Sequence, residues 1–265
     1  MKNPEKLKRG NESRQMSIFF SHLEGFTSIS ESLGQAELTH LLNDYLAEMT
    51  DIILEEQGTV DKVEGDAIIA FWNAPLEVEN HAEGSVRAAM RCQHRLTLIR
   101  PDYLEEYGKV LNMRIGINSG TAILGNMGST RFDYTVPDDA VNLAARLGEA
   151  NKVFGTHTIL SESTFKQLGK KIFCRELARI RVVGRKEEVR IYEPLSDTGT
   201  GTEKEYRSFL RGLELFYAGN FKPAWEEFMK TAAKDGAARA YSLKCRDLDD
   251  SPPERWDGVW ELAGK

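Results

Sequence analysis

The feature that most constrains the fold is a polar-tipped hairpin in the first third of the chain. Residues 58–72 read GTVDKVEGDAIIAFW, where two runs of β-forming residues flank a Glu64-Gly65 pair that suits a tight turn. The apolar second run predicts a strand buried in a sheet. Lys62 and Asp66 lie beside the turn, where a rigid hairpin could hold a ligand and a metal ion. A solvated turn with a surface ion pair is the alternative interpretation.

Apolar periodicity on either side of the hairpin predicts the rest of this unit. A short apolar run predicts a buried strand, and apolar residues at three- and four-residue steps predict amphipathic helices. The expected elements are a strand at residues 16–21, a loop at 22–27, a helix at 38–53, the hairpin, a helix at 81–98, and strands at 113–118 and 121–124 joined across Ser119-Gly120. This is the ferredoxin-like βαββαβ order. Its antiparallel sheet carries both helices on one face and leaves the other face free for a partner or a ligand.

The next residues predict further elements of the same α+β domain, which is expected to end near residue 195. They are a strand at 132–136, a helix at 139–152, and short segments at 158–161, 165–168, 180–183 and 189–192 that complete the domain. On the expected helix, Asn142 and Arg146 are four residues apart and therefore share one face. They are candidates for a joint site, with an ordinary surface amide and a solvated arginine as the alternative.

Beyond residue 195 the composition changes to that of a helical extension. Amphipathic helices are expected at 206–218, 223–233 and 236–245, and the first two resemble one tetratricopeptide-like hairpin. Because a single repeat of this kind cannot bury its own core, we expect it to pack on the main domain. The expected organisation is an N-terminal linker at 1–15, the main domain at 16–195, a small-residue linker at 196–202 and the extension at 203–265.

The composition is that of a soluble globular protein. The 265 residues are 41% hydrophobic and 29% charged, which suits one ordinary domain with a small appendage. The net charge of −6 does not suggest a nucleic-acid surface. No apolar run approaches the ~20 residues of a membrane span. The first 15 residues lack the apolar core of a signal peptide, and the three separated cysteines suit a reducing compartment. We therefore expect a cytoplasmic chain without membrane contact of its own.

Seven short sequence blocks carry a resemblance to a known family. They are FFSHLEGFTSISE, LLNDYL, GTVDKVEGDAIIAFWNAP, MRIGINSG, GNMGS, YTV followed by DAVNLAARL, and GTHTILSE. In this order they resemble the catalytic domain of class III nucleotidyl cyclases, the adenylate and guanylate cyclases, from about residue 16 to residue 195. The NPEKL segment and the tail ending in WDGVW resemble bacterial cyclases that carry a membrane-bound sensor upstream. The resemblance therefore implies such a sensor in a full-length protein.

The resemblance also implies roles for individual residues. These are adenine recognition by Lys62, a second base contact by Thr135, ribose orientation by Asn142, stabilisation of the reacting phosphate by Arg146, contact with the terminal phosphates by Arg185, and binding of two divalent cations, Mg²⁺ or Mn²⁺, by Asp66 and the residue at position 22. A lysine with a small hydroxyl partner suits adenine. The implied reaction converts ATP into 3′,5′-cyclic AMP and pyrophosphate in intracellular signalling. In the family, the hairpin residues and the helix residues meet across a homodimer interface, so each site is shared and the monomer is inert.

Two positions depart from the family pattern. His22 stands where the family has a metal-binding aspartate, and Pro137-Asp138 stands where it usually has an apolar residue and a glycine. Mg²⁺ prefers carboxylate and water oxygens, whereas imidazole suits transition metals better. We therefore expect reduced activity, with manganese favoured if His22 is natural.

Other interpretations of the chain stay open at this point. One is a catalytically degenerate domain that acts as a nucleotide-binding or dimerising regulatory module. A harmless loop histidine at position 22 is another. A diguanylate cyclase on a related fold is disfavoured, because its acidic signature loop is absent and the chain offers only VEGD at residues 63–66.

Overall fold

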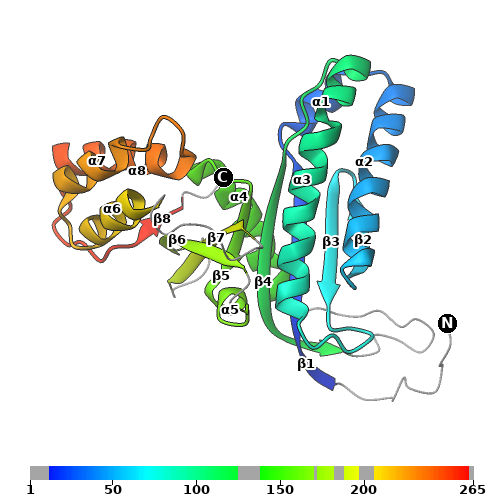
Figure 1. Ribbon diagram of the computed structural model, residues 1–265, viewed down its shortest axis with the longest axis horizontal. Helices are drawn as coiled ribbons and strands as arrows, with labels where there is room; N and C mark the ends of the chain where they lie inside the picture. The colour runs from blue at the N-terminus through cyan, green and yellow to red at the C-terminus, as the bar shows by residue number, and fades with distance from the viewer. Residues whose placement is uncertain (1–11, 125–137, 170–171, 182–187, 197–205, 263–265) are drawn as a thin grey trace.

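A single mixed sheet organises the molecule. The computed structural model describes residues 12–124, 138–169, 172–181, 188–196 and 206–262. Within these ranges the sheet has eight strands in the order β2-β3-β1-β4-β5-β7-β6-β8 (Figure 1). The expected α+β class is confirmed. The strand expected at 132–136, with Thr135, and the candidate Arg185 lie outside the described residues.

The first four strands and three helices form the expected ferredoxin-like unit. Its elements are β1 (Glu12–Leu23), α1 (Phe26–Ser32), α2 (Gln35–Glu55), β2 (Thr59–Glu64), β3 (Ala67–Trp72), α3 (His81–Tyr107) and β4 (Met113–Leu124). The strands pair antiparallel in the order β2-β3-β1-β4. In Figure 1, α2 and α3 lie along one side of these strands. Between them a core forms in which Tyr45, Met49 and Trp72 are fully buried.

Two segments are more extended than the sequence suggested. His22 is not in a loop, because β1 continues to Leu23 and pairs there with Met113 of β4. The Ser119-Gly120 pair makes no turn, and β4 runs unbroken across it. The Ser119 side chain is buried and bonds the hydroxyl of Ser17 on β1 at 2.6 Å, so a polar pair inside the sheet takes the place of the expected turn.

The second face of β1 and β4 is covered rather than free. Helix α4 (Asp138–Phe154) packs on it and buries Met16, Ile18 and Ala144 in a small apolar cluster. The backbone contact is close, because a side chain on Gly116 of β4 would place its Cβ 2.0 Å from the carbonyl oxygen of Ala144. The sequence thus predicted the helix but not the face that it covers.

The second half of the chain extends the sheet and adds helices to it. Its elements are β5 (Thr158–Ser161), α5 (Glu162–Phe165), β6 (Phe173–Arg181), β7 (Val189–Ser196), α6 (Arg207–Tyr217), α7 (Phe221–Met229), α8 (Gly236–Asp250) and β8 (Trp260–Glu261). The segment at 165–168, whose type the sequence left open, is not a strand. A helical turn forms there instead, since Ser161 caps α5 by accepting the backbone N–H of Thr164.

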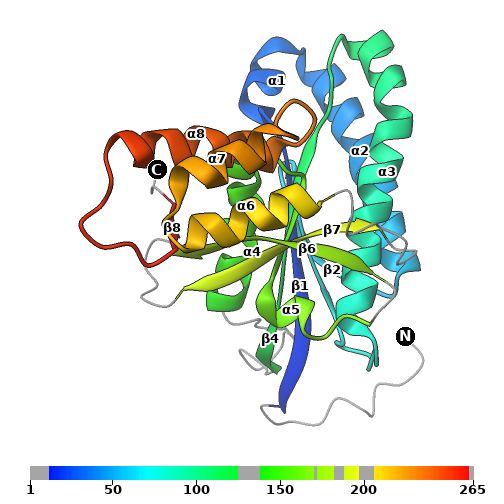
Figure 2. The same ribbon diagram turned by 60° about the vertical axis from the view of Figure 1, so that its left-hand side comes forward.

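Helices α6 to α8 pack against the sheet and against α4, as Figure 2 shows. Phe154 at the end of α4 contacts Tyr241 of α8 and Trp260 of β8, with ring centroids 6.1 and 5.1 Å away. Arg175 of β6 is nearly buried and forms ion pairs with Glu193 of β7 and with Asp235, which caps α8. The extension is therefore joined to the helix that carries Asn142 and Arg146. None of the described helices has both the length and the apolar character that a membrane span requires.

Candidate active site

Helix α4 presents two of the predicted site residues on its solvent side. Asn142 and Arg146 lie one turn apart, and both side chains are exposed. The opposite side of α4 is fixed to β4 by the close approach at Gly116 and by Asn151, whose side-chain amide donates to the carbonyl oxygen of Ile115 at 2.9 Å. A rigid support of this kind holds an amide and a guanidinium at a constant spacing.

The hairpin places its two polar residues in different surroundings. Lys62 on β2 is 53% exposed, and its Nζ lies 3.2 Å from the Glu64 carboxylate on the same strand. Asp66 follows the turn, and its Oδ2 accepts the backbone N–H of Leu23 at 2.8 Å. The turn residue between the strands, Gly65, has a φ of +63°, which glycine adopts without strain. The hairpin tip is thereby tied to the end of β1, next to His22.

The side chain of His22, near the end of β1, faces α4. Its Nε2 lies 3.4 Å from Oε1 of Glu149 on α4, and its side chain is 16% exposed. Its Nδ1 is buried and has no hydrogen-bond partner among the described residues. Burial lowers the pKa of the imidazole, against the opposing charges of Glu149 and Asp66. The ring is therefore neutral near pH 7, and its Nε2 faces the Glu149 carboxylate.

This donor set does not fit a pair of magnesium ions. At the matched positions it offers one carboxylate, Asp66, whose Oδ2 already accepts a backbone N–H, and one imidazole paired with Glu149. Mg²⁺ binds oxygen ligands and is a poor match for imidazole. Across the described ranges, no group of three or more histidine, cysteine, aspartate or glutamate side chains is arranged to hold a metal ion. Imidazole is a ligand that transition metals accept more readily than Mg²⁺ does.

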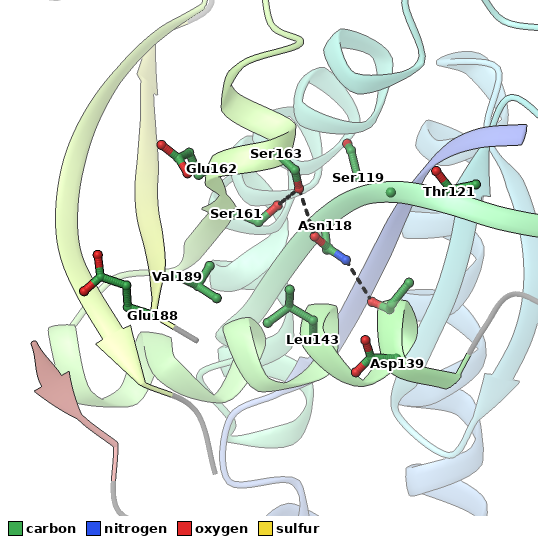
Figure 3. A pocket seen from close by; sticks show the side chains of 12 residues that line it. Asn118, Ser119, Thr121, Asp139, Leu143, Ser161, Glu162, Ser163, Glu188 and Val189 are labelled. Atoms are coloured by element: carbon green, nitrogen blue, oxygen red, sulfur yellow. Dashed lines mark hydrogen bonds between the residues drawn. The ribbon is translucent and has the colours of Figure 1, made fainter. Parts of the chain in front are cut away.

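A cavity of about 380 Å³ opens beside the first turn of α4 (Figure 3). It is lined by Asn118, Ser119, Gly120, Thr121, Asp139, Ala140, Leu143, Ser161, Glu162, Ser163, Glu188 and Val189. Three of these are carboxylates, which disfavour a nucleotide triphosphate. Neither Asn142 nor Arg146 faces into it. Asn142 and Arg146 therefore lie on a side of α4 that does not line this cavity.

The structure brings together part of the predicted constellation. His22 and Asp66 meet at the end of β1, and Glu149 joins His22 to the helix of Asn142 and Arg146. Lys62 instead pairs within its own strand. Sequence reasoning missed Glu149. Its place three residues after Arg146, on the same helix face, was the available signal.

Comparisons with known proteins agree with the sequence blocks. The family model for the adenylate and guanylate cyclase catalytic domain matches residues 9–193. Adenylate cyclase 1 of Rhizobium meliloti is 30% identical over 181 residues, which are 68% of this chain and 27% of that protein. The adenylate cyclase of Anabaena cylindrica is 33% identical over 193 residues, again 68% of this chain and 37% of that protein. The chain thus spans about a third of the length of these relatives.

Two solved structures share the fold with sequence identities of 33% and 30%. The adenylyl cyclase CyaB from P. aeruginosa superposes with a TM-score of 0.64 at 33% identity, covering 71% of this chain and 96% of that one. The guanylyl cyclase Cya2 superposes with a TM-score of 0.63 at 30% identity, covering 72% and 96%. With the family model spanning most of the chain, these matches show that the protein belongs to the family of adenylate and guanylate cyclase catalytic domains.

Proposed function

We propose that this domain is an adenylate cyclase that converts ATP into 3′,5′-cyclic AMP and pyrophosphate as a homodimer. The observation that carries the proposal is the exposed pair Asn142 and Arg146 on a rigidly held helix whose next turn reaches His22. Lys62 and Thr135 favour adenine over guanine, and two relatives described above are named adenylate cyclases.

The proposed chemistry uses the residues as binding and orienting groups. Lys62 donates to the adenine edge, and the Asn142 amide orients the ribose so that the 3′-oxygen faces the α-phosphorus. As that oxygen attacks and pyrophosphate leaves, negative charge grows on the phosphate oxygens. The Arg146 guanidinium stabilises this charge, an electrostatic role whose loss typically lowers kcat by about 10²- to 10³-fold.

A homodimer supplies the second wall of the nucleotide site, which one copy lacks. Asn142 and Arg146 are exposed, and neither lines the acidic cavity beside the first turn of α4. A nucleotide held by these two residues needs a second wall. In the proposed assembly, the His22 and Asp66 end of one copy provides that wall for the Asn142 and Arg146 face of the other. Each of the two sites is then shared.

Activity with magnesium is proposed to be low. The His22–Glu149 contact stands where the family has a metal-binding carboxylate, so one anionic ligand is lost. A divalent cation bound there would offset the charge of the triphosphate, and Mn²⁺ is the better match for the donors present.

The test is the substitution His22→Asp, assayed for cyclic AMP and cyclic GMP formation from ATP and GTP. The proposal expects weak cyclic AMP synthesis by the unsubstituted protein and a gain of about 10²-fold or more with magnesium in the variant. A preference for GTP would refute the assignment to ATP. No gain in a variant that folds and dimerises would indicate that the rest of the site is not competent.

A second candidate is a regulatory module that binds nucleotide or dimerises without turnover. The observation that favours it is the pairing of His22 with Glu149, which occupies the position of a metal ligand with a neutral ring. Binding of ATP without cyclic AMP formation, in Mg²⁺ and in Mn²⁺, would support this candidate over the cyclase.

A further inference from the structure

A continuous hydrogen-bonded network of buried polar side chains crosses the sheet behind α4. It begins at His81, the first residue of α3, whose Nδ1 lies 2.8 Å from the hydroxyl of Ser17 on β1. Ser17 is 2.6 Å from the hydroxyl of Ser119 on β4, and Ser119 donates to Thr164 of α5 at 3.0 Å. Thr164 in turn lies 3.1 Å from the hydroxyl of Ser161. All five side chains are buried.

This hydrogen-bonded network continues to α4, as the dashed lines of Figure 3 show. Ser161 contacts Ser163 at 2.8 Å, and Ser163 donates to Oδ1 of Asn118 at 3.2 Å. The side-chain nitrogen of Asn118 then donates to the carbonyl oxygen of Ala140 at 3.2 Å. Asn118 is only 5% exposed. A hydrogen-bonded path therefore leads from α3 through β1, β4 and α5 to the first turn of α4.

The proton positions along this path are largely determined. Each hydroxyl has one proton to donate. Thr164 donates to the carbonyl of Ile117, and Ser119 donates to Thr164, so Ser17 must donate to Ser119. His81 then supplies an N–H from Nδ1 to Ser17, which requires that tautomer in the neutral ring. At the other end, the Asn118 amide has one orientation, because its oxygen faces a donor and its nitrogen faces a carbonyl.

The Asn118 amide bonds the helix close to the residues that face the nucleotide. Ala140 precedes Asn142 by two residues and Arg146 by six, within the first three turns of α4. Gly116, two residues before Asn118 on β4, lets the α4 backbone lie directly on the strand but supplies no polar bond. The position of α4 along the strand is therefore set by contact at Gly116, by the Asn151 bond in its later turns and by the directional Asn118 bond at its first turn.

We propose that Asn118 is a positioning residue of the nucleotide site, which it serves through Ala140 by fixing the first turn of α4. Ser163 assists by orienting the Asn118 amide. The inference rests on the proposed role of Asn142 and Arg146, since Asn118 itself is buried behind the helix and does not face the exposed side that carries them.

Two substitutions and one matched control test this role. Asn118→Asp keeps the shape but sets a carboxylate oxygen against the Ala140 carbonyl, and Ser163→Ala leaves Asn118 in place without its orienting donor. Asn73→Asp is the control. That amide has the same bonding pattern, donating to the Gln15 carbonyl at 2.8 Å and accepting the Val78 N–H at 2.7 Å. It lies at the end of β3, and aspartate tolerates its φ of +77°.

The first measurement is amide hydrogen exchange over residues 139–146, compared with α3 in the full chain. We expect about tenfold faster exchange over this segment in Asn118→Asp, a smaller increase in Ser163→Ala, and no change there in Asn73→Asp. The second is steady-state kinetics. There we expect kcat to fall by about 10- to 100-fold in Asn118→Asp, with KM for ATP changed less than about threefold.

Unchanged amide hydrogen exchange over residues 139–146 in Asn118→Asp would overturn the proposal. A loss of kcat in Asn73→Asp equal to that in Asn118→Asp would overturn it too. Should Asn118→Asp fail to fold, Ser163→Ala decides by the same two measurements. An unsubstituted protein without turnover would count against the proposed cyclase function alone. In that case the exchange data, together with the Kd of a non-hydrolysable ATP analogue in each variant, still decide whether Asn118 positions α4.

Discussion

Gly116 is the point at which a single methyl group should displace α4. A Cβ at this position would lie 2.0 Å from the Ala144 carbonyl oxygen and 2.4 Å from the Gly148 nitrogen. Both are backbone atoms of α4, so no side chain can rotate away. A Cβ on Gly120, four residues further along β4, would meet nothing within 4 Å, and Gly120 does not have a positive φ. Gly116→Ala and Gly120→Ala therefore form a matched pair on one strand.

The expected magnitude follows from the overlap at Gly116. A Cβ contact of about 3 Å to a backbone oxygen requires α4 to move outward by about 1 Å, and overpacking of this kind typically costs about 1–3 kcal/mol of unfolding free energy. A helix displaced by about 1 Å also misplaces Asn142 and Arg146, which can cost about 10²-fold in rate. Gly120→Ala is expected to be neutral or to add about 0.4–1 kcal/mol, because alanine restricts the unfolded chain.

The assay combines urea unfolding with cyclic AMP formation at saturating ATP. Gly116→Ala should lose both stability and kcat, whereas Gly120→Ala should keep both. Full activity in a folded Gly116→Ala protein would refute the claim that the close packing of α4 on β4 positions the site. Equal losses in the two variants would show that alanine on this strand is harmful for another reason.

Three further predictions address the extension, the buried histidine and the metal. Arg175→Met should cost about 3–5 kcal/mol in urea unfolding, because it leaves the carboxylates of Glu193 and Asp235 unpaired in a nearly buried position; a loss below about 1 kcal/mol would contradict this. Burial lowers the pKa of His81, so below pH 6.5 the unfolded state binds the extra proton and stability falls as the pH decreases, by up to about 1.4 kcal/mol per pH unit. His81→Gln should show a shallower loss between about pH 7.5 and 5.5, and an unchanged slope would count against it. Mn²⁺ should support several-fold faster cyclic AMP synthesis than Mg²⁺, an advantage that His22→Asp should remove; equal rates with both ions in the unsubstituted protein would argue otherwise.

The regular elements were predictable because local signals and packing agree. The apolar stripes that predicted α2 and α3 are the stripes that cover the sheet, and the hairpin at residues 58–72 has the expected turn. The secondary-structure prediction was wrong where pairing between distant strands determines the backbone conformation. The Ser119-Gly120 pair resembles a turn, yet a twelve-residue partner in β1 and a buried serine pair keep β4 extended. Near residue 165 the sequence left the type of element open, and the Ser161 cap starts a short helix there.

The roles of the candidate site residues stay predictions, and their contacts could not be predicted from the sequence. Motif spacing singled out Asp66, Asn142 and Arg146 without any knowledge of packing. The contact between His22 and Glu149 depends on how α4 lies across β1, and the bond from Asn118 depends on a network drawn from six elements. Interactions between segments so far apart along the chain have no local signal in a single sequence.

The shared site is tested most directly by mixing two inactive variants. Asp66→Ala removes a group from one wall of the proposed cleft, and Arg146→Ala removes a group from the other. Each variant alone should lose at least about 10²-fold in cyclic AMP formation with Mn²⁺. An equimolar mixture forms heterodimers in which one of the two sites is intact, so it should recover about a quarter of the unsubstituted activity. A mixture no more active than its separate components, under conditions where the subunits exchange, would contradict the shared site.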